Sequence, residues 1–544
     1  MNVLDWLVIF LYFAGIVGFA AYCGRGQKNA HDYFLAGRRI KWWQSGASTM
    51  ATQLSAVSFV SAPAFVALKP GGGLKWLAYE FAVPFALILV MSVIIPVLHK
   101  RNHVSIYMYL EERFDPGVRA LVSILFLLGR GLATGVALLA GGLILSTALS
   151  ISTMSAILLI GVITLVYDVL GGIRIVVLSD VVQMTIIIVG LGLCLGIAWH
   201  LVGWDAAWAA LPLDRTRILL FNQWGLTPQT TYGFWPMLVG GFFLYASYYG
   251  TDQSQVQREL TVENIDDVKK SLVLNALGRF PVVLFYIVMG VFVGAVFTMP
   301  DKITAIAANM NLNSALLNQV LTKDPDRMVP MFIMTFLPHG IVGLILVAIM
   351  AALMSSLDSG INSLSAVTMK DIYQRYVNKQ ATERHYLMSS KIITLLWGVF
   401  CVVFAILLSA SGQATRQTTI VVINAVGSML YGPVLAAFVI GMFSRTVTPA
   451  TVKTAVVAGL FANITLWKLT DISWMWWNVS GFAVPVIVAI VGTLFSKMPA
   501  PQALSDSRLA LQEKTGIDWN RIYGALSLYA VLIIGAAWVV ERIG

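Results

Sequence analysis

The stretches GASTMATQLSAVSFVSAPAF (46–65) and GGFFLYASYYGTDQSQVQR (240–258) decide the fold that this sequence predicts. Both lie in apolar runs, yet the first is dense in Ser and Thr with Pro63 near its end, and the second combines three glycines with a polar tail. They lie five predicted helices apart, as expected of broken helices at equivalent places in two inverted repeats. Close packing through small residues explains either run alone. The pairing favours a transporter.

Composition places the whole chain in a bilayer. Of 544 residues, 58% are hydrophobic and 11% charged, against roughly 25% charged in globular proteins. About fourteen apolar runs reach the roughly 20 residues that a spanning helix needs. The connections are too short for a soluble domain, although 328–340 predicts a short outer helix. We expect an all-α membrane protein with one transport domain over 1–544. Its predicted parts are an extra helix (1–30), two inverted repeats (43–202 and 233–444) and extra C-terminal helices (449–544).

The distribution of Lys and Arg predicts the orientation of the helices. The first run lacks the positive leader of a removable signal peptide, so we expect it to remain as a helix. With the N-terminus outside, twenty-four of the thirty-six cations fall on the inner side, including three in 258–270 that begin at Arg258, and ten fall outside. Trp42 and Trp43 beside Lys41 suit an interfacial belt. We therefore predict both termini outside the cytoplasm, in a bacterial inner membrane or a eukaryotic plasma membrane. The scattered cations argue against nucleic-acid binding.

The run AIMAALMSSLDSGINSLSAVTMKDIY (348–373) carries the strongest local signal. Ser355, Ser356, Asp358 and Ser359 span just over one helical turn, with Ser355 and Ser359 on one face. Sodium is a hard cation that prefers oxygen ligands, and hydroxyls with exposed carbonyls can supply them. Hydroxyls that bond to neighbouring helices are the alternative, and the better one for an isolated Ser. Four polar residues together favour an ion site.

Ionisable residues inside spans are functional candidates, because each costs at least about 2.5 kcal/mol at mid-membrane unless it is paired or hydrated. Such residues are Glu80, Arg130, Asp180, Asp252, Arg279 and Asp358. Asp252 and Arg279 suit the inner boundary, where snorkelling or a local ion pair would explain them. Glu80 and Arg130 are deeper and of opposite sign. A salt bridge between these two and substrate binding by them are about equally favoured.

Five motifs together resemble the signatures of the sodium/solute symporter family, which includes bacterial sodium–galactose and sodium–sialic acid symporters. They are DYFLAGRRIKWWQSGAS (32–48), YLEERFD (109–115), YDVLGGIRIVVLSDVVQ (167–183), TDQSQVQREL (251–260) and AALMSSLDSGINS (351–363). The likeness runs in order from about residue 30 to about 445. It implies a leucine-transporter-like 5+5 inverted-repeat fold with two broken helices, and sodium-driven symport by alternating access. Sodium is then the coupling ion, and no organic cofactor is expected.

The resemblance also implies where sodium binds. Matching the family's common sodium site gives carbonyl ligands at Ala51, Leu54 and Ala352 and hydroxyl ligands at Ser355 and Ser356. Some members bind a second sodium ion, and the matching residues are Asp180, Asp358 and Ser359. Asp358 departs from the family pattern, which has Ser, Thr or Ala there. A second carboxylate could strengthen this site, accept a proton, or repel Asp180 unless a cation intervenes.

Candidate substrate-binding residues follow from the same resemblance. Tyr79 and Glu80 resemble the Tyr-Glu pair of the sugar symporters, and Arg130 resembles the arginine that meets a carboxylate in sialic acid symporters. The remaining candidates are Gln53, Ser55, Ser58 and Tyr248. Tyr245 stands where the galactose symporter has Asn. This mixture predicts a small polar solute, best a sugar, a carboxylated sugar or an organic acid, with Arg130 on the carboxylate and Glu80 on hydroxyls. A neutral sugar, with Arg130 paired to Glu80, is the close alternative.

Other classes of protein fit less well. An enzyme would need a nucleophile–base or metal constellation, and the six histidines show no such spacing. A channel or sensor of the same fold and a proton-coupled symporter remain as alternatives. Neither the substrate nor the oligomeric state follows from the sequence.

Overall fold

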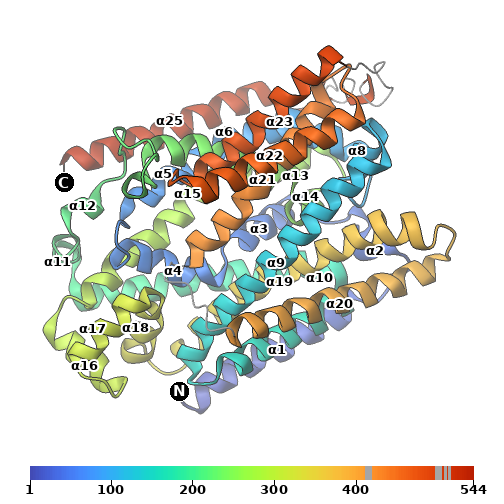
Figure 1. Ribbon diagram of the computed structural model, residues 1–544. Helices are drawn as coiled ribbons and strands as arrows, with labels where there is room; N and C mark the ends of the chain where they lie inside the picture. Colours follow the sequence, from blue (N-terminus) through green and yellow to red (C-terminus); the bar gives the residue numbers. More distant parts are fainter. Residues whose placement is uncertain (411–418, 496–504, 508–510, 512–515, 544) are drawn as a thin grey trace.

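The computed structural model describes residues 1–410, 419–495, 505–507, 511 and 516–543, and every regular element in these ranges is helical. Figure 1 shows long helices packed side by side, with the short helices α11, α12, α16, α17 and α18 gathered toward the left end. Helix α1 begins and helix α25 ends toward that same end. Two parts of the predicted distribution of cations are not covered by the described residues. Most of 497–521, which carries four of the cations counted as inner, lies outside them, and so does Arg416, which was counted as outer.

The long helices carry most of the apolar runs. They are α1 (Val3–Cys23), α9 (Pro116–Leu149), α10 (Thr153–Val202), α15 (Ile265–Val296), α19 (Ile341–Val367), α20 (Glu383–Ala410), α21 (Thr419–Phe443), α22 (Pro449–Leu469), α23 (Met475–Phe495) and α25 (Trp519–Ile543). The shorter helices are α2 (Ala30–Leu35), α3 (Trp42–Gln53), α4 (Ala56–Ala67), α5 (Leu77–Glu80), α6 (Ala82–Leu89), α7 (Ile95–His99), α8 (Met108–Arg113), α11 (Trp204–Ala209), α12 (Leu213–Thr216), α13 (Gly241–Thr251), α14 (Gln253–Glu259), α16 (Pro300–Asn309), α17 (Ser314–Lys323) and α18 (Met328–Phe336). Helix α18 confirms the short helix predicted within 328–340.

Eleven helices of the described ranges are long and apolar enough to cross a membrane, or up to twelve if one bent pair counts as a span. This number is lower than the fourteen runs in the sequence, for two reasons. Helix α10 has 50 residues, enough for two spans of about 20 residues on either side of Gly172, so it contains two of the predicted runs. The run around residue 243 is divided between the short helices α13 and α14.

Both predicted breaks are present in the helices. Helices α3 and α4 meet at Leu54 and Ser55 with a bend of 52°. Helix α13 ends at Thr251 and α14 begins at Gln253, with an extended backbone at Asp252 between them (φ −89°, ψ 118°). Polar backbone groups freed at such breaks are tolerated at membrane depth only where protein or a cavity receives them. The breaks therefore mark where polar chemistry enters the bundle.

Helix α10 changes direction at Gly172, between its two predicted spans. The backbone there has φ +58° and ψ −158°, a conformation that is essentially restricted to glycine. A Cβ atom at this position would lie 2.6 Å from the carbonyl oxygen of Tyr33 on α2. The absence of a side chain thus allows both the turn and the close approach of α2.

Replacing Gly172 with Ala is expected to destabilise the protein by about 1–3 kcal/mol, because a Cβ atom disfavours this backbone conformation. The measurement is the temperature at which half of the detergent-purified protein loses its monodisperse peak. Gly196→Ala is the matched control, since Gly196 lies in the same helix and a Cβ atom added there would have no neighbour within 4 Å. Equal transition temperatures for both variants would contradict the expected role of Gly172.

Candidate functional site

The first break lies against the middle of α19. The Ser356 hydroxyl donates to the carbonyl oxygen of Thr52 at 3.0 Å and to that of Ala352 at 3.3 Å. Thr52 in turn shares a hydrogen bond of 3.1 Å with Ser359. The fold therefore brings together the two segments that hold the predicted ligands of the first sodium ion, Ala51, Leu54, Ala352, Ser355 and Ser356.

Ser355 lies at this junction with its hydroxyl fully buried. The hydroxyl is near the Asp180 carboxylate, yet it forms no hydrogen bond of normal geometry with any described residue. A buried hydroxyl without a partner costs free energy, which a bound cation would recover. The chemistry of this junction, hydroxyls and backbone carbonyls around a break, fits a hard monovalent cation.

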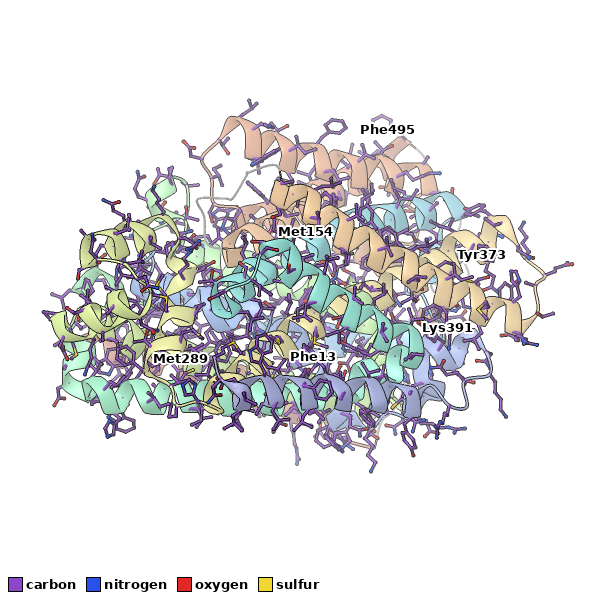
Figure 2. All side chains as sticks on the ribbon, turned by 90° about the horizontal axis from the view of Figure 1, so that it is seen from below. Phe13, Met154, Met289, Tyr373, Lys391 and Phe495 are labelled. Carbon is purple, nitrogen blue, oxygen red and sulfur yellow. The ribbon has the colours of Figure 1, made fainter. Side chains whose placement is uncertain are left out.

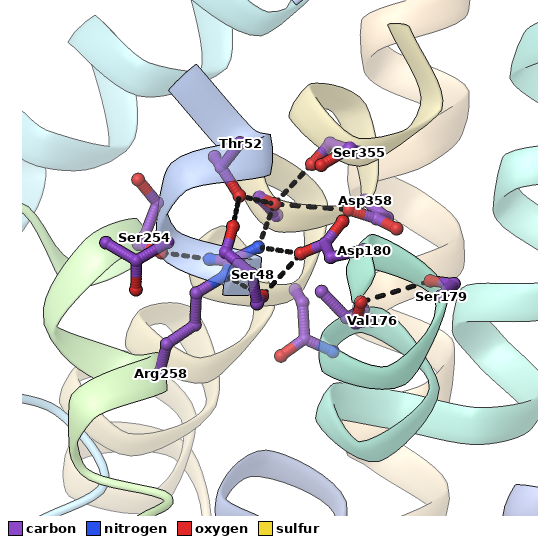
Figure 3. A network of polar contacts seen from close by, with 12 residues as sticks. Ser48, Thr52, Val176, Ser179, Asp180, Ser254, Arg258, Ser355 and Asp358 are labelled. Carbon is purple, nitrogen blue, oxygen red and sulfur yellow. Dashed lines mark hydrogen bonds and ion pairs between the residues drawn. The ribbon is translucent and has the colours of Figure 1, made fainter. Parts of the chain in front are cut away.

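The guanidinium group of Arg258 occupies the space beside Asp180. Figure 3 shows this side chain reaching from α14 toward Ser48 and Asp180. Its Nη2 donates to Oδ2 of Asp180 at 3.1 Å and also to the Ser359 hydroxyl, and its Nε donates to Ser48 at 2.6 Å. Ser48 also donates to Asp180 at 2.5 Å. One guanidinium group thus links helices α3, α10, α14 and α19.

The prediction that Arg258 belongs to an inner connection is wrong. Its side chain is completely buried, because the polar tail forms helix α14, all of whose residues are buried in the bundle. The position between Asp180 and Ser359, predicted for a second sodium ion, therefore holds a cation that the protein supplies. A polar segment that directly follows a break inside an apolar run is the sequence signal that could have located this arginine.

Asp358 lies on the other side of the same cluster. Its Oδ2 accepts a hydrogen bond of 2.5 Å from Tyr167, and its Oδ1 accepts one of 3.1 Å from Ser359. Asp168 is also buried in this region and accepts from Asn362 at 3.1 Å. When all are ionised, Asp168, Asp180 and Asp358 outnumber the single guanidinium group. A bound cation or a proton on one of these carboxyl groups would balance the excess negative charge.

A cavity of about 140 Å³ lies next to the first break. Six of the seven predicted substrate-binding residues line it: Gln53, Ser55, Ser58, Tyr79, Arg130 and Tyr248. Its wall also includes Thr52, Ser356, Arg279 and the aromatic residues Trp76, Tyr245, Tyr286 and Tyr431, among others. Thr52 and Ser356 line the cavity, and they also join the two segments that hold the predicted sodium ligands. The cavity and the predicted sodium site are therefore adjacent.

Glu80 is the predicted residue that does not line the cavity. Its carboxylate is fully buried, and its Oε2 accepts from Nε of Arg279 at 3.0 Å and from the Tyr245 hydroxyl at 2.9 Å. The predicted alternative of a salt bridge between Glu80 and Arg130 is therefore wrong. Arg279 also lies beside the cavity, contrary to the expectation that it lies near the inner boundary. Glu80 acts here by holding two cavity-lining side chains.

Arg130 pairs instead with Asp252, the residue at the second break. The closest atoms, Nη1 and Oδ2, are 3.7 Å apart, which is a loose ion pair. A second cavity of about 70 Å³ begins at this pair, and Arg130, Ala133 and Tyr431 line both cavities. Asp252 is held in turn by Ser254, whose amide and hydroxyl donate to its Oδ1 at 2.8 and 2.6 Å. Arg130 therefore stands between the larger of these two cavities and the second break.

The sequence pattern did not distinguish most of the aromatic residues that line the cavity. Aromatic residues occur throughout the apolar runs, so neither Trp76 nor Tyr431 differs in pattern from a lipid-facing residue. Arg279 carried a signal, its charge within a span, but its partner lies 199 residues away in the sequence. The pairing of charges at this site depends on the packing of helices that are distant in the chain.

We expect Glu80→Gln and Arg279→Gln to be strongly non-additive in thermal stability, with a coupling of about 0.5–3 kcal/mol, because each removes the same buried ion pair. Glu80→Gln and Arg130→Gln should be additive within about 0.5 kcal/mol, since these residues have different partners. Thermal unfolding of the single and double variants, compared with the parent, provides the measurement. Coupling of Glu80 to Arg130 rather than to Arg279 would contradict this assignment.

Comparison with known proteins agrees with the arrangement of the helices. The model of the sodium:solute symporter family matches residues 33–459, which is more than three quarters of the chain. The sodium/sialic acid symporter NanT of Aliivibrio fischeri is 29% identical over 91% of this chain and 93% of its own length. The human sodium/iodide cotransporter is also 29% identical, over 81% of this chain but only 65% of its own length.

A solved structure of a Na⁺-coupled sialic acid symporter, in a substrate-bound outward-open state, superposes on 92% of this chain and 99% of its own. The TM-score is 0.80 and the sequence identity is 24%, so this likeness shows the fold, which is leucine-transporter-like. Together with the family match, it identifies a sodium-coupled transporter and not an enzyme. The chain therefore belongs to the sodium:solute symporter family.

Proposed function

We propose that this symporter carries a small organic solute with a carboxylate group, best a carboxylated sugar or a related polyhydroxy acid. One observation carries the proposal: the cavity beside the first break is lined by two guanidinium groups, Arg130 and Arg279, and by no carboxylate among the residues that the structure describes. Arginine presents a planar set of donors that matches a carboxylate in two parallel hydrogen bonds. An anionic solute therefore fits the cavity better than a neutral one.

Several polar atoms near the cavity have no hydrogen bond of normal geometry with any described residue. They are Nε of Arg130, Nη1 of Arg279 and both amide atoms of Gln53. Buried polar groups are usually satisfied, so atoms left without partners at a cavity are candidates for ligand contacts. The guanidinium groups suit a carboxylate, and the Gln53 amide can both donate to and accept from hydroxyls. This set supports a solute that has an acid group and hydroxyls.

The aromatic side chains favour a sugar-like body for the same solute. Tyr79 and Tyr245 stack at a centroid distance of 4.6 Å, and Trp76 packs against Tyr79 at 5.7 Å. Such side chains present an apolar face and a polar edge together, which suits a ring with hydroxyls at its rim. Sialic acid and iodide, which are named in two of the relatives, are both anions, whereas glucose, named in a third, is neutral.

The proposed coupling ion lies at the junction of α3 and α19. Sodium is held there by the carbonyls of Ala51, Leu54 and Ala352 and by the hydroxyls of Ser355 and Ser356. Ser356 already joins the two segments through Thr52, and the excess of buried carboxylates nearby favours a cation. Because Arg258 fills the place beside Asp180 and Ser359, the proposal names one sodium ion.

Transport follows from the difference in sodium affinity between two arrangements of the same helices. Sodium that bridges α3 and α19 stabilises the arrangement in which the cavity is formed, and inward opening separates these helices and releases the ion. An ion can shift such an equilibrium only through its different affinity for the two states. At 100 mV, each inward sodium ion contributes about 2.3 kcal/mol before any concentration gradient.

Removing either hydroxyl ligand should weaken sodium binding. We expect Ser355→Ala and Ser356→Ala each to raise the sodium concentration for half-maximal uptake about tenfold, because a polar contact to a charge contributes about 1.5 kcal/mol. Uptake into proteoliposomes is measured against external sodium. Ser363→Ala is the matched control, because that hydroxyl donates within its own helix, to the Gly360 carbonyl at 2.8 Å. Sodium dependence unchanged in both test variants would count against the site.

The charge of the substrate is tested with matched ligands that differ only in the acid group. In the presence of sodium, glucuronate at 100 times its Kd should stabilise the purified protein by about 2.7 kcal/mol, while glucose should give no comparable shift. Arg130→Gln should remove most of the stabilisation by the acid, because it removes a carboxylate partner. The same measurement is made with sialic acids, monocarboxylates and further neutral hexoses. Stabilisation by neutral hexoses and by no acid would overturn the proposal.

A further inference from the structure

A third cavity, lined by basic residues, lies apart from the two cavities described above, at the end of the bundle where α1 ends. Its volume is about 430 Å³, and its wall comes from the end of α1, the connection to α2, the segment 36–40 and helix α10. Four cationic side chains line it, those of Arg25, Lys28, Arg39 and Arg174, with Asp32 as the single acidic one. The cavity therefore carries a clear excess of positive charge.

These four cations differ from others on the side predicted to be cytoplasmic. There, Arg119 pairs with Asp371 at 2.6 Å, Arg375 with Glu111 at 2.8 Å and Lys453 with Asp115 at 3.0 Å. Within the described ranges, no ion pair joins any of the four cavity cations to a carboxylate, and all four side chains are exposed. Asp32 is engaged locally, as it accepts a hydrogen bond of 3.1 Å from the amide of Lys28. Four cations that line one cavity and have no carboxylate partner in the described part of the chain indicate a site for an anion.

The cavity is built by contacts between separate elements. The Gln27 side chain donates to the carbonyl of Gly171 at 2.8 Å, which ties the connection after α1 to the turn of α10. The turn at Gly172 then presents Arg174 on the exposed side of α10. Gly37, with φ +60°, turns the chain just before Arg39, which also lines the cavity. The cations thus come from three segments that the fold brings together.

Exposed aromatic residues place this cavity at the boundary of the bilayer. Tyr22 is 62% exposed in the last turn of α1, and Trp42 and Trp43 are 36% and 42% exposed at the start of α3. Such residues gather at the headgroup level of membranes. Helix α1, marked by Phe13, lies along one edge of the molecule in Figure 2, so the cavity opens beside a lipid-facing helix. A ligand there can have acyl chains in the bilayer.

We propose that this cavity binds the phosphate headgroup of an anionic phospholipid, through Arg25, Lys28, Arg39 and Arg174. Basic pockets between spanning helices on the cytoplasmic side suit such headgroups, because anionic lipids are enriched in that leaflet. The guanidinium groups supply paired donors to phosphate oxygens, and Lys28 supplies a point charge. The flanking aromatic residues favour a lipid over free phosphate. This binding is independent of the solute that the transporter carries.

The test uses the full-length protein purified in a neutral detergent, with native mass spectrometry to count retained lipids. Dioleoyl phosphatidylglycerol should bind in preference to dioleoyl phosphatidylcholine, which has the same acyl chains but no net charge. Arg25→Gln combined with Arg39→Gln should weaken phosphatidylglycerol binding about 25-fold, since each cation near a membrane surface contributes about fivefold. Lys379→Gln combined with Arg384→Gln is the matched control: it removes two exposed cations from the same predicted face, outside the cavity.

Three results would overturn the proposal. The first is unchanged phosphatidylglycerol binding in the cavity variant, and the second is an equal loss in the control variant, which would show general surface charge. The third is displacement of phosphatidylglycerol by inorganic phosphate at equal concentration, which would show a free-phosphate site. Sodium-dependent uptake by the cavity variant in phosphatidylcholine vesicles shows that it folds, so that a loss of lipid binding is assigned to the cavity.

Discussion

A guanidinium group in the middle of an apolar bundle must be surrounded by oxygen atoms, and Arg258 finds them on four helices. Asp180 on α10, Ser48 on α3, Ser359 on α19 and the backbone of its own helix at Ser254 all accept from it. Leaving such a group without partners would cost several kcal/mol, so any movement that separates these helices must give Arg258 other partners. The position of the first break relative to α19, and with it the predicted sodium site, depends on this contact.

The need to pair buried charges also determines how the side chains around the cavity are held. Glu80 cannot remain alone at membrane depth, and it binds Arg279 and Tyr245, which fixes two walls of the cavity from behind. Arg130 is held more loosely by Asp252 at the second break, so it is the guanidinium group most easily drawn toward a ligand. The two broken helices therefore contribute differently. In the proposed function, the first supplies backbone carbonyls for the ion, and the second supplies the carboxylate that restrains the proposed substrate-binding cation.

Much of this arrangement follows from local patterns in the sequence. Ser, Thr and Pro63 in an apolar run predicted the break between α3 and α4, and three glycines before a polar tail predicted the one at Asp252. Matching to the family located six residues that line one cavity. The partner of Glu80 and the location of Arg258 were not predicted. Both depend on side chains that meet across 199 and 78 residues of sequence, and no local period encodes such distances.

The sequence by itself determined that the chain lies in a bilayer, where its helices break, and that hydroxyls cluster on α19, because hydropathy, glycine and polar residues act over a few neighbouring positions. Only the tertiary structure decided which cation meets which carboxylate. It paired Arg279 with Glu80 and Arg130 with Asp252, it placed Arg258 beside Asp180, and it gathered four cations around one cavity at the end of α1. Charge interactions in a medium of low dielectric constant depend on separations of a few ångströms, and helix packing sets those separations.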